Sequence, residues 1–385
     1  MGYLKNIKNG FKLKHYINYI VVAAALVLFF ILGSMGALGR SNLVLLHRIA
    51  YSVVLAVSLN LVVGFLGELS LGHAGFMCVG AYIGCYFGVN MIDVLGSPLL
   101  TMILSMLVGG LVAAVFGFII GLPALRLKGD YLAIVTLAFG EIVRNIFKNL
   151  PLFGGAMGMQ TNKISYNQNK LYIISFIVVL VVLFLIQNLI RSKHGRAITA
   201  IRDNEIAARA MGINVTYYKL FVFVFSAFFA GVAGVMYGHQ IPLVTQTTFS
   251  YNYSIEILVM VVLGGMGSIG GSIAAATLIT YINFVLQNQL SGDLAALKLL
   301  IYAIILILVV VFSNAPALKP LRERFNFKAL LRRITRAHKK PEHILDDDAE
   351  WNRVETKIKM DELLSVDFQN SKAYTPDKKP KKEDK

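Results

Sequence analysis

Charged side chains are scarce in this sequence of 385 residues. Asp, Glu, Lys and Arg make up only 15% of the chain, against 56% hydrophobic residues, whereas roughly a quarter of the residues in an ordinary soluble domain are charged. The mean hydropathy of +0.66 agrees with this bias. The composition excludes a soluble globular domain and predicts an all-α polytopic membrane protein.

Acidic residues are rarer than basic ones, which gives a net charge of +16. Residues 1–340 hold 28 Lys and Arg but only 9 Asp and Glu, whereas residues 341–385 hold 9 and 12. The basic residues gather at the ends of apolar segments, as positive-inside topology requires. We therefore expect contact with a lipid bilayer and no nucleic-acid surface.

Cysteine and recognisable catalytic patterns are also nearly missing. The two cysteines, Cys78 and Cys85, lie in one apolar segment without a C-x-x-C pattern, which predicts packing residues. The histidines show no H-x-x-x-H spacing, and no nucleophile–base motif is present. Gly265–Gly270 matches G-x-G-x-x-G, but Gly271 stands where a phosphate-binding loop needs Lys. We expect no catalytic, metal or cofactor site.

What the chain does contain is a series of long apolar segments. Ten are long enough to place helices in a membrane, and we expect eight to ten full spans. They lie at about 17–38, 43–66, 69–91, 98–122, 130–149, 170–190, 217–240, 254–266, 270–289 and 294–313.

Basic clusters give these spans an orientation. With residues 1–16 inside as a basic N-terminus, Arg126 and Lys128 follow the fourth span, 191–219 follows the sixth and 319–340 follows the tenth. All three clusters then fall on the cytoplasmic side. This predicts cytoplasmic N- and C-termini.

The domain organisation follows from the same patterns. We expect one transmembrane domain over 17–318, with 191–219 as a cytoplasmic loop. Residues 319–340 mix apolar and basic side chains and suit the surface of an anionic leaflet. Residues 341–385 are polar and predict a disordered cytoplasmic tail.

Glycines interrupt the apolar segments at two places, and elsewhere they allow helices to pack closely. One break contains Gly64, Gly67, Gly72 and Gly75, and the other covers 264–271. Broken helices at membrane depth must be buried in protein or line a wet cavity, so both breaks are candidates for a translocation path; two tight hairpins are the alternative. Close helix packing is predicted at Gly80, Gly84, Gly88, Gly234 and Gly238.

Polar residues inside the apolar segments are functional candidates, because an unpaired polar group is costly there. An internal pair between Glu141 and Arg144, three residues apart, is an alternative to a solute contact, and interfacial solvation could account for Glu68 and His73. The candidate path residues are Asn60, Glu68, Ser70, His73, Glu141, Gly264 and Gly265.

The stretch 191–219 is the longest polar interruption in the apolar body. Asp203 or Asn204 can cap a short helix, and Gly212 stands where a left-handed residue ends one. Such a capped, basic helix between two spans suits contact with a cytoplasmic partner. An ordinary solvated loop that sets topology is the alternative.

Four blocks of sequence carry a resemblance to a known family. Ser58–Phe76, Leu125–Ile142, Gly195–Ile213 and Val261–Gly270 resemble, in this order, the branched-chain amino acid ABC transporter permease family. The match is to the longer of its two permease subunits. The polar tail beyond about residue 340 departs from the usual pattern.

The resemblance implies a function and a set of partners. It implies a permease in the bacterial cytoplasmic membrane that forms a heterodimer with a second permease subunit. Two cytoplasmic ATPases would hydrolyse ATP, so this chain would not be an enzyme, and an extracytoplasmic solute-binding protein would deliver the ligand. The resemblance further implies a coupling helix that docks on an ATPase, with contributions from Gly195, Arg196, Arg202, Glu205, Ala208, Met211 and Gly212.

Other functions fit part of the sequence. Leucine, isoleucine and valine are the expected solutes, but related permeases are associated with urea, short amides and nucleosides. An ion-coupled secondary carrier would explain the broken helices and Glu141, yet it would leave the capped helix at 204–211 without a purpose. An intramembrane enzyme or a structural scaffold has less support, because no catalytic cluster is recognisable and polar groups at depth are costly.

Overall fold

The computed structural model describes residues 17–34, 39–127, 129–164 and 168–289, with the single positions 304 and 307. Several predictions fall outside these residues: the N-terminal segment 1–16, Lys128, the apolar segment 294–313, the basic segment 319–340 and the tail 341–385. The described part is all-α apart from one pair of two-residue strands, as the composition predicts.

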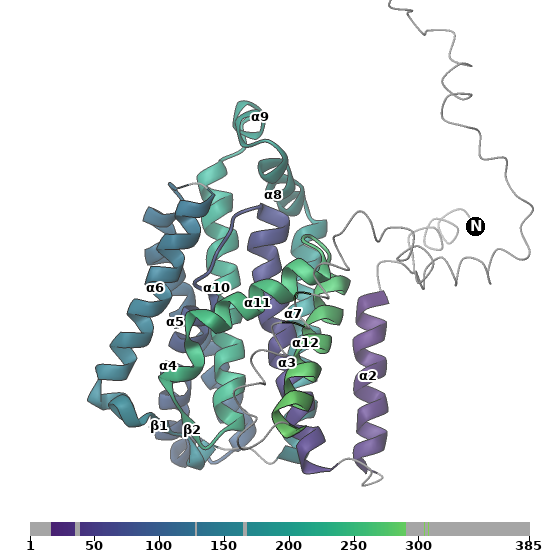
Figure 1. Ribbon diagram of the computed structural model, residues 1–385, viewed down its shortest axis with the longest axis vertical. Coiled ribbons are helices and arrows are strands. Elements are labelled where there is room, and N and C mark those ends of the chain that lie inside the picture. Colours follow the sequence, from purple (N-terminus) through teal and green to yellow (C-terminus); the bar gives the residue numbers. More distant parts are fainter. Residues whose placement is uncertain are drawn as a thin grey trace, which may run out of the picture. The chain divides into compact units, whose positions relative to one another are not determined.

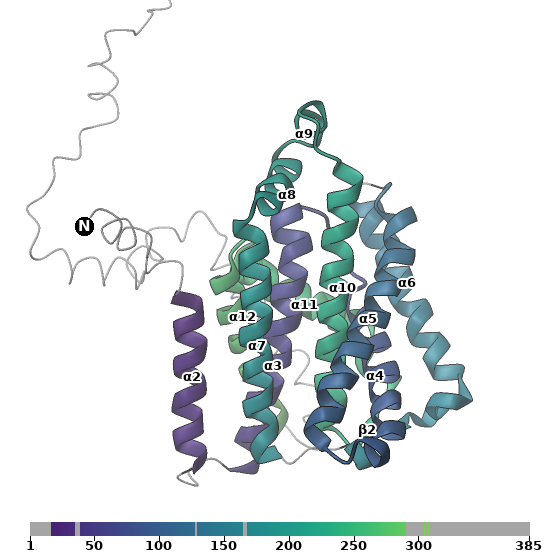
Figure 2. The same ribbon diagram turned by 180° about the vertical axis from the view of Figure 1, so that it is seen from behind.

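Long helices run roughly side by side and form the body of the protein (Figures 1 and 2). They are α2 (Ile17–Ser34), α3 (Arg40–Asn60), α4 (His73–Leu95), α5 (Pro98–Ala124), α6 (Asp130–Asn149), α7 (Gln168–Arg191), α10 (Val215–Gln240) and α12 (Ile269–Gln289).

Shorter elements connect these helices. They are the π-helix η2 (Leu61–Leu66), the 3-10 turns η3 (Pro151–Phe153), η4 (Gly155–Met157), η5 (Asn162–Ile164) and η6 (Gln246–Phe249), the helices α8 (Lys193–Asp203), α9 (Glu205–Ala210) and α11 (Tyr251–Gly264), and the strands β1 (Met159–Gln160) and β2 (Leu243–Val244). The strands pair antiparallel, with Met159 opposite Val244. Helices α8 and α9 lie at one end of the bundle and the strands at the other (Figures 1 and 2).

The expected count of membrane spans is met only roughly. Within the described residues, six helical segments have the length and composition of a span: Arg40–Leu66, His73–Leu95, Pro98–Ala124, Leu171–Arg191, Val215–Gln240 and Ile269–Gln287. The segment predicted at 130–149 is α6, which carries four charged residues. The segment predicted at 254–266 is α11, whose 14 residues reach only about 21 Å, less than the hydrocarbon thickness of a bilayer.

Glycines allow α4, α5 and α10 to approach closely in the core. A Cβ on Gly80 would collide with the backbone of Gly231 in α10, and one on Gly84 would lie 2.8 Å from the carbonyl oxygen of Ser105 in α5. The predicted packing role of the glycines is therefore confirmed. Cys78 and Cys85 are fully buried free thiols in the same core, as predicted.

Candidate functional site

The segment between α7 and α10 folds into two capped helices. Ser192 Oγ accepts hydrogen bonds from the backbone N–H groups of His194 and Gly195 at the start of α8, at 3.1 and 3.4 Å. Asn204 Oδ1 accepts one from Ala207 N at 3.0 Å and starts α9. Gly212 follows α9 with φ = 82°. The predicted short helix is confirmed, with Asn204 as its cap.

The longer helix α8 was not predicted. Its signals were Ser192, a typical N-cap residue, and two apolar side chains on one face, Ile198 and Ile201, which are both buried. The many charges of this stretch obscured the pattern.

Two large apolar side chains are exposed on α9 and on the residue that caps its C-terminus. Ile206 and Met211 are 80% and 82% exposed, whereas Ala208 is buried. Met211 was among the predicted coupling residues, but Ile206 was not. The signal for Ile206 was an aliphatic residue at the start of a short helix that is otherwise alanine and charge.

The remaining predicted coupling residues differ in their surroundings. Arg196 and Gly212 are exposed. Gly195 is buried, and a Cβ there would collide with the carbonyl group of Ile190 at the end of α7. Gly195 therefore allows the tight corner between α7 and α8.

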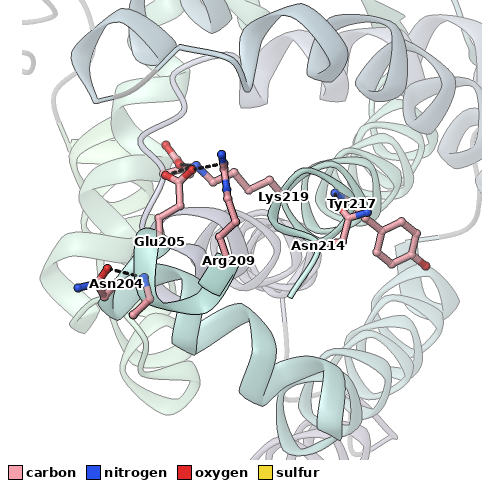
Figure 3. A network of polar contacts seen from close by, with 8 residues as sticks. Asn204, Glu205, Arg209, Asn214, Tyr217 and Lys219 are labelled. Carbon is pink, nitrogen blue, oxygen red and sulfur yellow. Dashed lines mark hydrogen bonds and ion pairs between the residues drawn. The ribbon is translucent and has the colours of Figure 1, made fainter. Parts of the chain in front are cut away.

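A buried lysine joins α9 to the body of the bundle (Figure 3). The Lys219 side chain in α10 is only 5% exposed, and its Nζ lies 2.5 Å from Glu68 Oε1 and 3.2 Å from Glu205 Oε2. Glu205 also pairs with Arg209, one turn along α9, at 3.1 Å. One ammonium group thus bridges the first residue of α9 and the chain just beyond η2.

Arg202 connects α8 to the first helix break. Its Nη1 donates a hydrogen bond to the carbonyl oxygen of Gly64 at 3.1 Å, while Nε and Nη2 bond Asp203 Oδ1. A Cβ on Gly67, which has φ = 82°, would lie 2.7 Å from Arg202 Cγ. The backbone of this break therefore packs directly on the arginine, and glycine is needed at residue 67 for both reasons.

Asn60, at the end of α3 just before the first break, forms hydrogen bonds with the second break. Its Nδ2 donates to Ser268 O at 3.2 Å and to Ser272 Oγ at 2.8 Å, and its Oδ1 accepts from Gly267 N at 2.9 Å. Asn60 is fully buried. The amide thus pairs with the N–H of Gly267 inside the interruption between α11 and α12, and it adds a second hydrogen bond to Ser268 O, which also accepts the N–H of Ser272.

Two predicted path residues, Gly264 and Gly265, form this second break. A Cβ on Gly264 would lie 2.5 Å from the backbone of Gly271 and Ser272, and Gly265 has φ = 87°. Both positions require glycine, since the backbones approach closely and the conformation is left-handed.

The other predicted path residues have different partners. His73 Nε2 lies 2.9 Å from Ser58 Oγ in a buried contact, and Ser70 is also buried. Glu141 pairs with Arg144 at 2.6 Å, which confirms the predicted internal pair, and its Oε1 accepts the N–H of Tyr251 at the start of α11. That these residues line a solute path stays a prediction.

Several ionisable side chains in the apolar segments were missed, and two of them contact the same helix. Arg48 in α3 and Glu256 in α11 both make side-chain hydrogen bonds to α12. The signal was available, because an ionisable residue within an apolar segment is a functional candidate by default.

Comparison with known proteins shows which family this chain belongs to. Residues 42–310 match the family described as "Branched-chain amino acid transport system / permease component". The high-affinity branched-chain amino acid transport system permease protein LivM of Salmonella typhimurium is 34% identical over 312 residues, covering 72% of this chain and 70% of that protein. LivM of Escherichia coli is 33% identical over 311 residues, covering 72% and 69%.

A more distant relative has a different solute in its name. The nucleoside ABC transporter permease protein NupC of Lactococcus lactis is 25% identical over 195 residues, covering 46% of this chain and 60% of that protein. No solved structure matches the chain.

The family match covers well over half of the chain and includes both helix breaks and the α8–α9 segment. A permease component is a transport protein and not an enzyme. The family assignment agrees with the glycine-broken helices and the apolar spans, and it is supported by two relatives above 30% identity. The chain belongs to the branched-chain amino acid transport system permease family.

Proposed function

We propose that this chain is a permease subunit of an ABC importer for leucine, isoleucine and valine in the bacterial cytoplasmic membrane. The names of the LivM relatives support this solute class. A nucleoside permease also aligns, at lower identity and coverage, so another small polar solute is the second candidate.

The importer would contain further subunits. A second permease subunit completes the translocation path, two cytoplasmic ATPases supply the energy and an extracytoplasmic binding protein delivers the solute. In this arrangement the α8–α9 end of the bundle, the N-terminus and the C-terminus are cytoplasmic, and the β1–β2 end faces outward.

The observation that carries the coupling role is the two-sided environment of α9. Ile206 and Met211 present apolar surface to solvent, and large exposed apolar side chains favour a docking surface. On its other side, Glu205 is held by the buried Lys219. A partner that moves α9 therefore moves a group that is ion-paired to the bundle.

The test is co-purification with the ATPase subunits, combined with leucine uptake. In the variant Ile206→Asp/Met211→Asp, two charges replace the exposed apolar surface. We expect the wild-type chain to retain the ATPases and to import leucine with ATP, and the double variant to lose both properties. Met157→Asp is the matched control, because Met157 is 86% exposed near the opposite end.

Two outcomes would contradict this function. If the double variant keeps the ATPases and full uptake, α9 is not the coupling element. If the wild-type chain binds no ATPase and moves leucine under a proton or sodium gradient, the chain is a secondary carrier.

A further inference from the structure

A polar cluster lies in the seam between α3, α11 and α12. Arg48 Nη1 donates a hydrogen bond to Gln287 Oε1 at 2.7 Å, and Asn283 Nδ2 donates one to Glu256 Oε1 at 2.5 Å. Asn283 and Gln287 are four residues apart and share one face of α12. This face of α12 therefore contacts both a cationic and an anionic side chain.

Both charges contact amides of α12, and Arg48 also bonds the side chain of Tyr51, but the two charges do not bond each other. Arg48 is close enough to Glu256 to influence it electrostatically, but within the described residues neither forms an ion pair with an opposite charge. Two opposite charges in an apolar segment would normally be expected to pair directly, because burying them separately is expensive. Neither charge is therefore neutralised by a direct ion pair with the other.

The same seam contains polar atoms without partners. Arg48 Nε and Thr280 Oγ1 are buried and have no hydrogen-bond partner within the part of the chain that the structure describes. Thr280 lies one turn before Asn283 on the same helix face. Since buried polar atoms are almost always hydrogen-bonded in proteins, these two atoms mark positions for the polar atoms of a ligand.

Aromatic side chains lie near the charges. Tyr51, Tyr237 and Tyr253 all lie within electrostatic range of Arg48. The rings of Tyr51 and Tyr237 are 5.8 Å apart, and that of Phe249 lies 5.7 Å from Tyr237. Aromatic faces of this kind provide contact area for an aliphatic side chain beside a polar head group.

We propose that this seam is a binding site for the zwitterionic head group of an α-amino acid on the translocation path. The Arg48 guanidinium binds the carboxylate through charge-assisted hydrogen bonds, and the Glu256 carboxylate binds the ammonium. Asn283 and Gln287 hold the two charged groups when no solute is bound. The assignment rests on the proposed function and adds the residues that distinguish amino acids from uncharged solutes.

The competing explanation is that these contacts are a structural staple, a set of polar bonds that only holds α3 and α12 together. Exchanging the positive and the negative residue distinguishes this structural role from a binding site. The swap Arg48→Glu/Glu256→Arg retains one positive and one negative group in the seam. A staple tolerates this exchange, whereas a site that orients a zwitterion presents the wrong charge to each end of the solute.

The experiment uses the complete transporter, with both permease subunits, ATPases and binding protein, in proteoliposomes loaded with ATP. For Arg48→Gln and Glu256→Gln we expect leucine uptake to fall about tenfold or more, the loss of one charge-assisted hydrogen bond, with ATP hydrolysis retained. The swap is expected to remain as inactive as the single variants. Arg40→Gln, at the exposed start of α3, should import normally.

The outcomes are decisive in both directions. Normal uptake by the neutral variants, or recovery of uptake in the swap, would overturn the site. If the neutral variants fail to assemble, Thr280→Val decides, since it removes the unpartnered hydroxyl with almost no change in shape. We expect about threefold slower uptake from it, and an unchanged rate would overturn the proposal. Failure of the wild-type chain to import leucine would instead contradict the proposed function.

Discussion

Lys219 and Glu68 lie 151 residues apart in the sequence and form a buried ion pair of 2.5 Å between α10 and the chain beyond η2. The same ammonium reaches Glu205 in α9. Any displacement of α9 must therefore carry the first helix break with it or separate a buried ion pair. Arg202 reinforces this link, because it bonds the carbonyl group of Gly64 in the same break.

Removing the ammonium should uncouple transport and destabilise the protein. In Lys219→Met, the carboxylates of Glu68 and Glu205 lose their shared cation, which typically costs about 3–5 kcal/mol for a buried pair. We expect a lower melting temperature in detergent and loss of ATP-driven leucine uptake. Lys193→Met, at the exposed start of α8, is the control, and equal effects from both variants would contradict the role of Lys219.

The two carboxylates should differ in importance. The Glu68 side chain is 12% exposed and closer to Lys219, whereas that of Glu205 is 21% exposed and shares its charge with Arg209. We expect Glu68→Gln to lower the free energy of unfolding more than Glu205→Gln does. Chemical denaturation of the purified subunit measures both, and the reverse order would show that Glu205 carries the main interaction.

Asn60 should control the stability of the second break. Asn60→Ala removes three hydrogen bonds to residues 267–272, each contributing about 1 kcal/mol. Hydrogen exchange should become faster in peptides that cover 264–272. Gly64→Ala should have the same effect, because the added methyl group would displace Asn60 Oδ1. Gly39→Ala, where a Cβ meets nothing within 4 Å, should leave the exchange unchanged.

Glu141 should stabilise the start of α11. Its carboxylate accepts the N–H of Tyr251 at 3.0 Å, where negative charge is favoured by the helix dipole, an effect of about 1 kcal/mol. In Glu141→Gln we expect faster amide exchange over residues 250–255. Lys148→Gln, on the same helix but exposed, should not change it. Exchange that is equally slow in both variants would show that α11 does not depend on this contact.

The local signals in the sequence predicted much of this architecture. The Asn204 cap, the left-handed Gly212, the Glu141–Arg144 pair and the two glycine breaks depend on short-range patterns, and the structure confirms each of them. Close packing at Gly80 follows equally from residue size. Such features are fixed by neighbours a few residues away, so a single sequence can predict them.

The tertiary partners could not be predicted in this way. Lys219 reads in the sequence as one more basic residue at a span end, but it is buried against two carboxylates, Glu68 at a separation of 151 residues and Glu205 at a separation of 14. Asn60 stays a predicted path residue, and nothing in the local sequence indicates that its amide has three partners beyond residue 266. Arg48 and Glu256 belong to one polar cluster only because both contact α12 in the folded protein. Contacts between different helices leave no periodic signal in the sequence.

The π-helix η2 gives the coupling route a place that can absorb a change of one residue in chain length. Its six residues contain a widened turn, and the N–H groups of Gly67 and Glu68 both reach back to the carbonyl group of Val62. A widened turn holds one residue more than an α-helical turn, so deleting one residue there would restore ordinary helical winding and leave the following chain on the same side of the helix. The same deletion inside the regular helix α3 would rotate everything that follows by about 100° about the helix axis. The two deletions remove the same length of chain, yet only the one in α3 would turn Glu68 away from Lys219.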